Sequence, residues 1–127
     1  MYLIATRSFP PELGGMQSLM WGLAKEMSKN FMIKVFADYQ ENHKEFDKEV
    51  NFSIERVGGI KFLRKIRKAQ LINEFLRENK VQGIIADHWK SLELIKTTNK
   101  KYCLIHGKEI NHPKGSFQNK KIVRILN

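Results

Sequence analysis

Cysteine is almost absent from this sequence: Cys103 is the only one, so no internal disulfide and no cluster of thiolate ligands can form. Apolar runs are short, and none approaches the roughly 18 to 20 residues that a membrane-spanning helix needs. The opening MYLIA is too short for the apolar part of a signal peptide and lacks a positively charged start. We therefore expect a cytoplasmic protein.

Acidic side chains are also scarce, with 13 against 23 basic ones, and the formal net charge is +10. This excess predicts an anionic partner, and nucleic acid, an anionic membrane face and a phosphorylated small molecule all satisfy it. No helix-turn-helix, RNP or zinc-finger pattern accompanies the charge, so we expect no nucleic acid. No histidine pair has helical i, i+4 spacing, so we expect no metal site.

The hydrophobic period alternates between strand-like and helix-like segments, as in β and α units that build a mostly parallel sheet. A length of 127 residues predicts one domain, residues 1–127. We predict a Rossmann-like α/β fold, with helices on both faces of the sheet and an exposed loop at 40–50. The predicted strands are 1–6, 31–39, 52–57, 81–87 and 102–107, and the predicted helices are 16–27, 60–80, 89–100 and 116–127.

The loop RSFPPELGG, after the first predicted strand, combines two prolines that stiffen it with two glycines, Gly14 and Gly15. We expect these glycines to allow positive φ and to let a ligand approach bare backbone. Their amides would lie at a helix N-terminus, where free N–H groups and the helix dipole favour an anion. The alternative is a purely structural turn, because the loop has no G-x-G-x-x-G pattern.

Polar residues also end the fourth and fifth predicted strands, where Asp87 and His88 close one and His106 and Gly107 close the other. The carboxyl ends of parallel strands meet at one edge of the sheet, so these residues predict a site there. For each histidine the alternative is an ordinary hydrogen-bonded imidazole. His106 is the stronger candidate for a site residue because it ends an apolar strand and Gly107 leaves space beside it.

The predicted helix 60–80 is basic, and we expect Phe62, Ile66, Ala69 and Ile72 to face inward and the cations outward. Cations beside bulky apolar groups can lie on an anionic membrane surface, where each contributes about 1 kcal/mol. The alternative is a solvated outer face. The cations of this expected face are Lys61, Arg64, Lys65, Arg67 and Lys68.

Four segments in this order resemble the amino-terminal domain of GT-B fold retaining glycosyltransferases of the family 4 type. They are FPPELGGMQSLMWGLAKEMSK, FMIKVFADY, VQGIIADHW and CLIHGKEI, and the resemblance covers essentially the whole chain. It implies transfer of a sugar from a nucleotide-sugar donor to an acceptor hydroxyl, with retained anomeric configuration and without a metal or other cofactor. It also implies a place in cell-surface polysaccharide or glycolipid synthesis.

The resemblance assigns roles to residues on the donor side. It implies that Gly14 and Gly15 approach the diphosphate or the sugar of the donor, and that His106 lies beside the donor sugar with Gly107 in the turn that follows. We expect His106 to hydrogen-bond the sugar or a nearby backbone group rather than to act as a general base.

The resemblance also assigns a second set of residues to the acceptor side. One of them, Gln17, stands at a position where the family often has glutamate. A basic helix after the third strand also presents cations to lipid phosphates in membrane-associated relatives, so a lipid-linked acceptor at the inner face of the membrane is expected. The acceptor-side residues are Gln17, Asp87, His88, Lys108 and Glu109.

Members of this family carry a second Rossmann-like domain that grips the nucleotide and supplies a glutamate pair spaced E-x7-E. We expect residues 1–127 to be the acceptor-side domain without that nucleotide-sugar-binding domain, and to be nearly inactive alone. The alternative is a non-catalytic Rossmann-like module that binds anions or a membrane surface.

Overall fold

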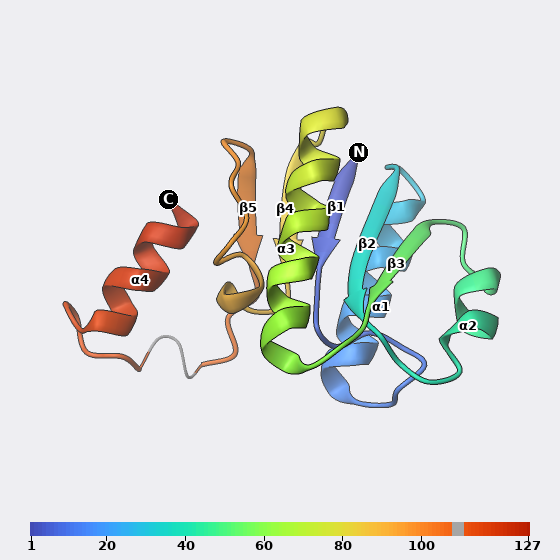
Figure 1. The fold of residues 1–127 in the computed structure, drawn as a ribbon, viewed down its shortest axis with the longest axis horizontal. Helices are drawn as coiled ribbons and strands as arrows, with labels where there is room; N and C mark the ends of the chain where they lie inside the picture. The colour runs from blue at the N-terminus through green and yellow to red at the C-terminus, as the bar shows by residue number, and fades with distance from the viewer. Residues whose placement is uncertain (108–110) are drawn as a thin grey trace.

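The structure, a computed structural model, describes residues 1–107 and 111–127 and confirms the predicted Rossmann-like α/β fold. Five strands form one sheet in the order β3-β2-β1-β4-β5, and all paired neighbours are parallel (Figure 1). The elements are β1 (Tyr2–Ala5), α1 (Gly15–Ser28), β2 (Ile33–Asp38), α2 (His43–Glu49), β3 (Ser53–Val57), α3 (Lys61–Glu78), β4 (Gly83–Ala86), the short 3-10 helix η1 (Trp89–Ser91), β5 (Lys100–Cys103) and α4 (Phe117–Leu126).

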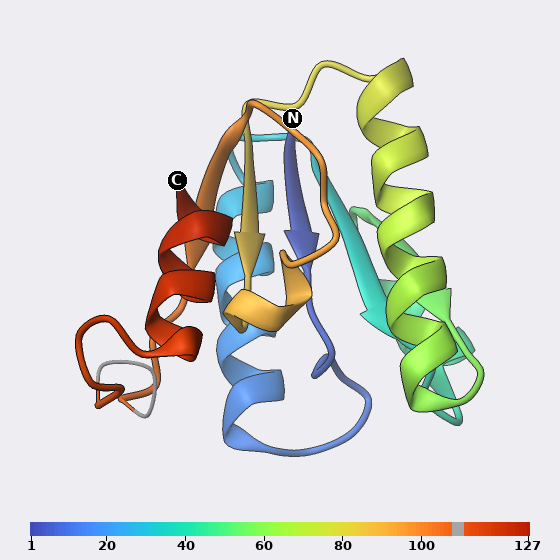
Figure 2. The same cartoon turned by 60° about the vertical axis from the view of Figure 1, so that its left-hand side comes forward.

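The strand order reverses direction at β1. The chain runs from β1 to β2 and β3 on one side, then crosses back so that β4 and β5 extend the sheet on the other side. Helices α1 and α2 pack on one face, and α3 and α4 pack on the other, as Figures 1 and 2 show. In such sheets ligands bind beyond the carboxyl ends of the strands at the reversal, which here lies between β1 and β4.

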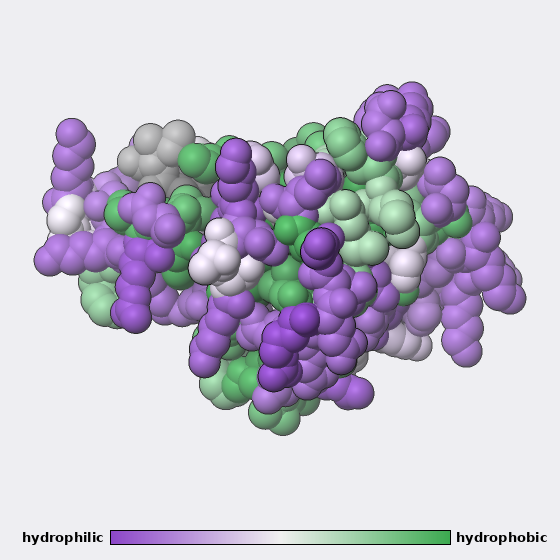
Figure 3. Space-filling view, turned by 90° about the horizontal axis from the view of Figure 1, so that it is seen from above, coloured by the Kyte–Doolittle hydropathy of each residue, from purple (hydrophilic) through white to green (hydrophobic). Residues whose placement is uncertain are grey.

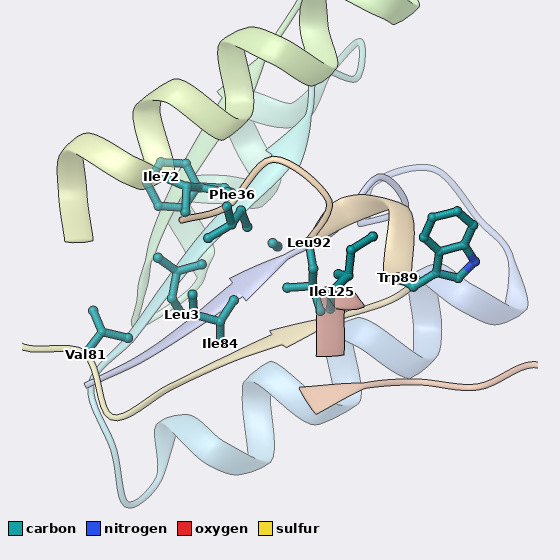
Figure 4. Packing of buried hydrophobic residues seen from close by; sticks show 11 residues of the cluster. Leu3, Phe36, Ile72, Val81, Ile84, Trp89, Leu92 and Ile125 are labelled. Atoms are coloured by element: carbon teal, nitrogen blue, oxygen red, sulfur yellow. The ribbon is translucent and has the colours of Figure 1, made fainter. Parts of the chain in front are cut away.

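The α3 face carries the larger apolar cluster. Ile72 of α3 packs over Leu3 and Phe36, and Ile125 of α4 closes the cluster beside Ile84 and its neighbours (Figure 4). Phe36 and the partly buried Phe75 meet edge to face, with ring centroids 5.8 Å apart. These contacts bury the α3 side of the three central strands.

The α1 face carries a second apolar cluster on the opposite side of the same strands. Met20 and Ala24 of α1 are fully buried against Ile4 and Val35. Leu3 and Ile4 therefore face opposite helix layers, because successive side chains of a strand alternate between the two faces. Burial on both faces explains why the strands read as continuous apolar runs.

The segment predicted as an exposed loop, 40–50, is instead a helix over most of its length. Phe46 of α2 packs against Phe9 and Trp21, with ring centroids 6.2 and 5.1 Å apart. Asp47 accepts hydrogen bonds from Arg56 of β3 and lies 2.8 Å from His43 Nδ1. One aromatic side chain and one partly buried ion pair hold this helix, so its sequence shows little apolar periodicity.

Two other predictions differ from the structure in extent. The predicted helix 89–100 is only the 3-10 turn Trp89–Ser91, followed by a loop that buries Leu92 and Ile95. The fifth strand is Lys100–Cys103 rather than 102–107, so His106 lies in the segment after it. In both cases, residues that were predicted to form a helix or a strand lie instead in an irregular segment.

Several large apolar side chains of the helices are exposed, and among them Phe62 was expected to face inward. Leu19 is 50% exposed, Phe62 is 72% exposed, and Phe117 at the start of α4 is 81% exposed. Phe62 lies in the first turn of α3, beyond the end of the sheet that the rest of the helix covers. Its inward orientation was a wrong prediction, because there is no strand beneath that turn for it to cover.

The two ends of the sheet differ in character. Hydrophilic side chains dominate the end where the strands begin, which Figure 3 shows from above. Among the described residues that the sequence singles out, those of the strand ends, the glycine loop and the start of α3 lie toward the opposite end, where the strands finish and α1 and α3 begin (Figure 1). In the described part of the chain, the helices are too short or too polar to traverse a bilayer.

Candidate functional site

A cavity of about 360 Å³ opens at the carboxyl edge of the sheet, on its α3 face. It lies where β1, β2 and β4 end and α3 begins, which is the reversal point of the strand order. Its volume falls within the range of about 300–1,000 Å³ that is typical of small-molecule sites. The lining residues are Arg7, Asp38, Lys61, Phe62, Arg64, Lys65, Lys68, Ala69, Lys90, Ser91 and Leu94.

The lining is strongly basic, with six cationic side chains and a single carboxylate, that of Asp38. The cations come from three parts of the chain: Arg7 follows β1, Lys90 belongs to η1, and the others belong to α3. A hollow with low-dielectric walls and charges of one sign concentrates ions of the opposite sign. The four α3 cations are Lys61, Arg64, Lys65 and Lys68.

Asp38 at the end of β2 is the electrostatic centre of the lining. One of its carboxylate oxygens accepts from Lys68 Nζ, and the other lies 2.9 Å from Arg64 Nε. Lys68 Nζ also donates to the Thr6 carbonyl at 2.7 Å. Burial lowers the pKa of Lys68 below its ordinary 10.5, while the Asp38 carboxylate opposes that shift. The network joins α3 to the ends of β1 and β2.

Asp87, assigned to the acceptor side by resemblance, lies beneath this cavity and is 2% exposed. Its Oδ2 accepts from Thr6 Oγ1 and the Arg7 amide, both at 2.8 Å, and its Oδ1 accepts from Ser91 Oγ at 2.8 Å. These bonds tie the end of β1 to η1. Asp87 therefore positions two lining segments of the cavity, and its role toward an acceptor stays a prediction.

His106 and His88 lie beside Asp87. His106 Nε2 donates to the Asp87 carbonyl at 2.8 Å, so the proton of this ring is on Nε2. The Lys90 amide donates to His88 Nδ1 at 3.1 Å, which makes that nitrogen an acceptor. Asp87 thus contacts both the cavity lining and His106, and the structure brings the ends of β4 and β5 together as predicted.

The glycine loop lies at the same edge, on the α1 face. Gly15 is the first residue of α1, and Gly14 before it has an extended φ of 167°. Neither glycine adopts the left-handed backbone region, so the expected positive φ was wrong; Gly107, with φ 87°, does adopt that region. A side-chain Cβ built at Gly15 would meet nothing within 4 Å, so the start of α1 is open.

Gln17, the residue in place of the family's usual glutamate, is engaged within the same loop. Its Nε2 donates to Glu12 Oε2 at 3.3 Å, and Gln40 Nε2 donates to that oxygen at 3.0 Å. Glu12 therefore fastens the glycine loop to the segment after β2, and Gln17 contacts that same carboxylate from α1. Two further acceptor-side predictions, Lys108 and Glu109, lie outside the described residues.

The expected outward orientation is wrong for one of the five α3 cations. Lys68 is only 5% exposed, and Arg64 and Lys65 line the cavity, where Arg64 pairs with Asp38 and Lys65 with Glu93. Lys61 lines the cavity as well and is exposed, and Arg67 is exposed without lining it. The cations of the first turns of α3 lie at the carboxyl edge because this helix extends past the end of the sheet.

The sequence carries a signal for this cavity. Lys61, Arg64, Lys65 and Lys68 follow the i, i+3, i+4, i+7 spacing, which places them on one helical face, whereas Arg67 falls outside that pattern. Arg7 stands directly after one predicted strand and Asp38 lies near the end of another, as site residues in such folds do. Lys90, in the turn after β4, had no distinguishing sequence signal.

No protein-family model matches this chain, and no curated protein matches it. Within residues 1–107 and 111–127, no three His, Cys, Asp or Glu side chains are grouped so that they could hold a metal ion. The chemistry of the site follows from its geometry, which is a cation-lined hollow joined through Asp87 to His106.

Proposed function

We propose that this chain is the amino-terminal, acceptor-side domain of a retaining glycosyltransferase. The observation that carries the proposal is the arrangement at the reversal point of the sheet, where Asp87 links a cation-lined cavity to His106. The open start of α1 at Gly15 lies at the same edge. An anionic sugar donor and a hydroxyl acceptor are substrates that these groups suit, and the order of the sequence motifs supports the same class.

In the proposed reaction the bond between the sugar carbon C1 and the diphosphate oxygen breaks, C1 bonds to the acceptor oxygen, and the proton of the acceptor hydroxyl passes to the leaving diphosphate. Negative charge develops on the leaving diphosphate, so backbone amides and cations aimed at it stabilise the transition state more than the ground state. The amides at the start of α1 fill this role on the donor side. His106 donates from Nε2 to a carbonyl, which fits a positioning role.

Turnover tests this proposal. We expect no transfer by residues 1–127 alone in a panel of nucleotide sugars, and transfer by a protein extended through a second, nucleotide-binding domain. Robust transfer by the 127 residues alone would contradict the assignment to one half of an enzyme. Absence of transfer by the extended protein with every donor and acceptor in the panel would contradict the enzyme class.

A matched pair of histidine variants sharpens the test in the extended protein. His106→Ala removes an imidazole at the proposed site, and we expect kcat to fall by about 10-fold, the effect of one lost hydrogen bond. His43→Ala removes an imidazole that pairs with Asp47 on α2, away from the cavity, and kcat should stay unchanged. Equal effects of the two substitutions would contradict the proposed place of His106.

The proposal includes a cytoplasmic location at the inner face of the membrane and a lipid-linked acceptor. Its support is the rim of the cavity, where Ile60, Phe62 and Leu63 are 71%, 72% and 56% exposed beside Lys61. Apolar side chains next to cations suit an anionic lipid surface. Cell fractionation tests the location, and recovery outside the membrane-associated and cytoplasmic fractions would contradict it.

The second candidate is a non-catalytic anion-binding module with the same fold. The cavity favours it as well, because six cations around one hollow attract an anion whether or not a reaction follows. The two candidates differ in turnover: the module binds anions and transfers no sugar, even when a second domain is present.

A further inference from the structure

The cations of the cavity fall into two sets according to their partners. Lys68 and Arg64 share the Asp38 carboxylate, and Lys65 pairs with Glu93. In contrast, Arg7, Lys61 and Lys90 have no carboxylate within ion-pair distance anywhere in the described part of the chain. The second set therefore leaves positive charge uncompensated in the cavity.

These three uncompensated cations reach the cavity from three separate elements. Arg7 follows β1, Lys61 begins α3 and Lys90 lies in η1. The segments that carry Arg7 and Lys90 are held together beneath the cavity by Asp87, which accepts from the Arg7 amide and from Ser91 Oγ. Charges spaced around a pre-formed hollow suit a multiply charged oxyanion, which can accept from several donors at once.

The cavity also has an apolar wall, made of Phe62, Ala69 and Leu94. Phe62 exposes 72% of its surface and Leu94 exposes 40%, so both have area left to cover. A bare inorganic anion would leave this wall in water, whereas an anion attached to an organic group covers it. Burial of apolar area contributes roughly 25 cal/mol per Å².

We propose that the cavity binds a phosphate monoester, with the phosphate contacting Arg7, Lys61 and Lys90 and the organic part packing on Phe62 and Leu94. The binding claim stands on the cavity alone, and it rests on the proposed function only in identifying this ligand as the acceptor. The paired cations Arg64 and Lys68 keep Asp38 occupied, so this carboxylate does not repel the phosphate at full strength.

Calorimetric titration of the 127-residue chain with glucose 1-phosphate and with inorganic phosphate tests the binding. The double variant Lys61→Ala/Lys90→Ala removes two cavity cations, and we expect affinity for glucose 1-phosphate to fall by about 10-fold for each cation removed. The matched control is Arg67→Ala/Arg77→Ala, which removes two exposed cations of α3 that do not line the cavity. Its affinity should stay close to that of the parent chain.

The apolar wall has its own test. Phe62→Ala should weaken glucose 1-phosphate and leave inorganic phosphate unchanged, because only the ester has an organic part to pack. If Lys61→Ala/Lys90→Ala and Arg67→Ala/Arg77→Ala lowered the affinity for glucose 1-phosphate equally, the proposal would be overturned, since net charge alone would then explain binding. Absence of binding of both probes to the parent chain at millimolar concentration would overturn it as well.

Vesicles separate a soluble ester from a lipid headgroup. We expect the chain to sediment with phosphatidylcholine vesicles that contain phosphatidic acid, and not with phosphatidylcholine alone, if the monoester is lipid-borne. A soluble ester predicts calorimetric binding without sedimentation, and both results support the cavity as the phosphate site. The proposal would be overturned if the chain sedimented without calorimetric binding and both double variants, Lys61→Ala/Lys90→Ala and Arg67→Ala/Arg77→Ala, weakened the sedimentation equally. Sugar transfer does not enter any of these measurements, so the proposed function can fail independently.

Discussion

The two faces of the sheet differ in what lies beside its carboxyl edge. On the α1 and α2 face, aromatic rings fill the space: Phe9 is fully buried, and its ring centroid lies 6.4, 6.2 and 6.5 Å from those of Trp21, Phe46 and Phe52. On the α3 face, the edge holds a cavity of about 360 Å³ lined by cations. We call these the closed face and the open face.

The charges on the two faces differ in the same way. Arg56, on the closed face, is held by Asp47 and the Pro10 carbonyl, and its guanidinium carbon lies 5.6 Å from the Phe9 ring centroid. On the open face, Arg7 and Lys61 have no such partner among the described residues. The fold thus packs aromatic rings on one face of the sheet, and it leaves a cavity lined by cations on the other.

The largest expected effect comes from opening the closed face. Phe9→Ala removes the ring around which three others pack, and we expect the free energy of unfolding to fall by about 4 kcal/mol. Urea titration followed by circular dichroism measures the change. Phosphate binding by the fraction that remains folded should be unaffected. A loss below about 1 kcal/mol would show that these rings do not hold the edge together.

A smaller effect is expected from the carboxylate of the open face. Asp38→Asn leaves Lys68 buried without its counter-charge, and unfolding free energy should fall by about 3 kcal/mol. The same substitution removes the one negative charge of the cavity lining, so affinity for glucose 1-phosphate should rise. Unfolding and calorimetric titrations on one preparation measure both.

The closed face offers a matched control for that substitution. Asp47→Asn weakens the buried pair with Arg56, and it should lower stability while leaving glucose 1-phosphate affinity unchanged. If Asp47→Asn also tightened binding, the gain at Asp38 would reflect net charge and not its place in the cavity. The contrast between the faces would then fail.

The fold could be predicted from the sequence further than the site could. Alternating periods place buried strands such as β1 and β4 because continuous apolar runs are a local signal. Helix α2 escaped prediction because Phe46 is held by Phe9 and Trp21, which lie far away in sequence. The local pattern around Phe46 contains too few apolar positions to define a helical face.

Residues of the site were predictable only where the chain marks them locally. His106 and Asp87 follow apolar strands, and the structure places them in contact. The orientation of Lys68 was predicted wrongly because its burial depends on Asp38 and on the Thr6 carbonyl, both contributed by other strands. Which end of a helix extends past a sheet is a tertiary property, so the sequence alone showed a basic helix but not a cavity.

The glycine loop tests whether the α1 side of the edge also receives a ligand. Gly15→Ala meets open space at the first residue of α1, so the free energy of unfolding should stay the same or rise by about 0.5 to 1 kcal/mol. If the donor approaches these amides, kcat/KM for sugar transfer in the extended protein should nonetheless fall, by about 10-fold. Unchanged transfer would make Gly15 part of a structural turn and the closed face free of any ligand role.

The smallest expected effect is an acid-dependent one at Glu93, which pairs with Lys65 of α3 and Lys121 of α4. Burial raises the pKa of the Glu93 carboxyl, but the hydrogen bonds from the two lysines outweigh it and keep that pKa below its ordinary 4.5. A lowered carboxyl pKa contributes stability that is present above pH 4.5 and is lost as the pH falls through the folded pKa.

Glu93→Gln should therefore cost about 0.4 kcal/mol near neutral pH, and its unfolding curve should converge with that of the parent chain in acid. Glu74→Gln, at an exposed position of α3, is the control and should leave stability unchanged at every pH. The deficit of Phe9→Ala, in contrast, should persist across the same pH range, because aromatic packing carries no charge. A pH-dependent Phe9 deficit, or a Glu93 deficit that persists in acid, would erase the physical distinction between a face closed by packing and a face governed by charge.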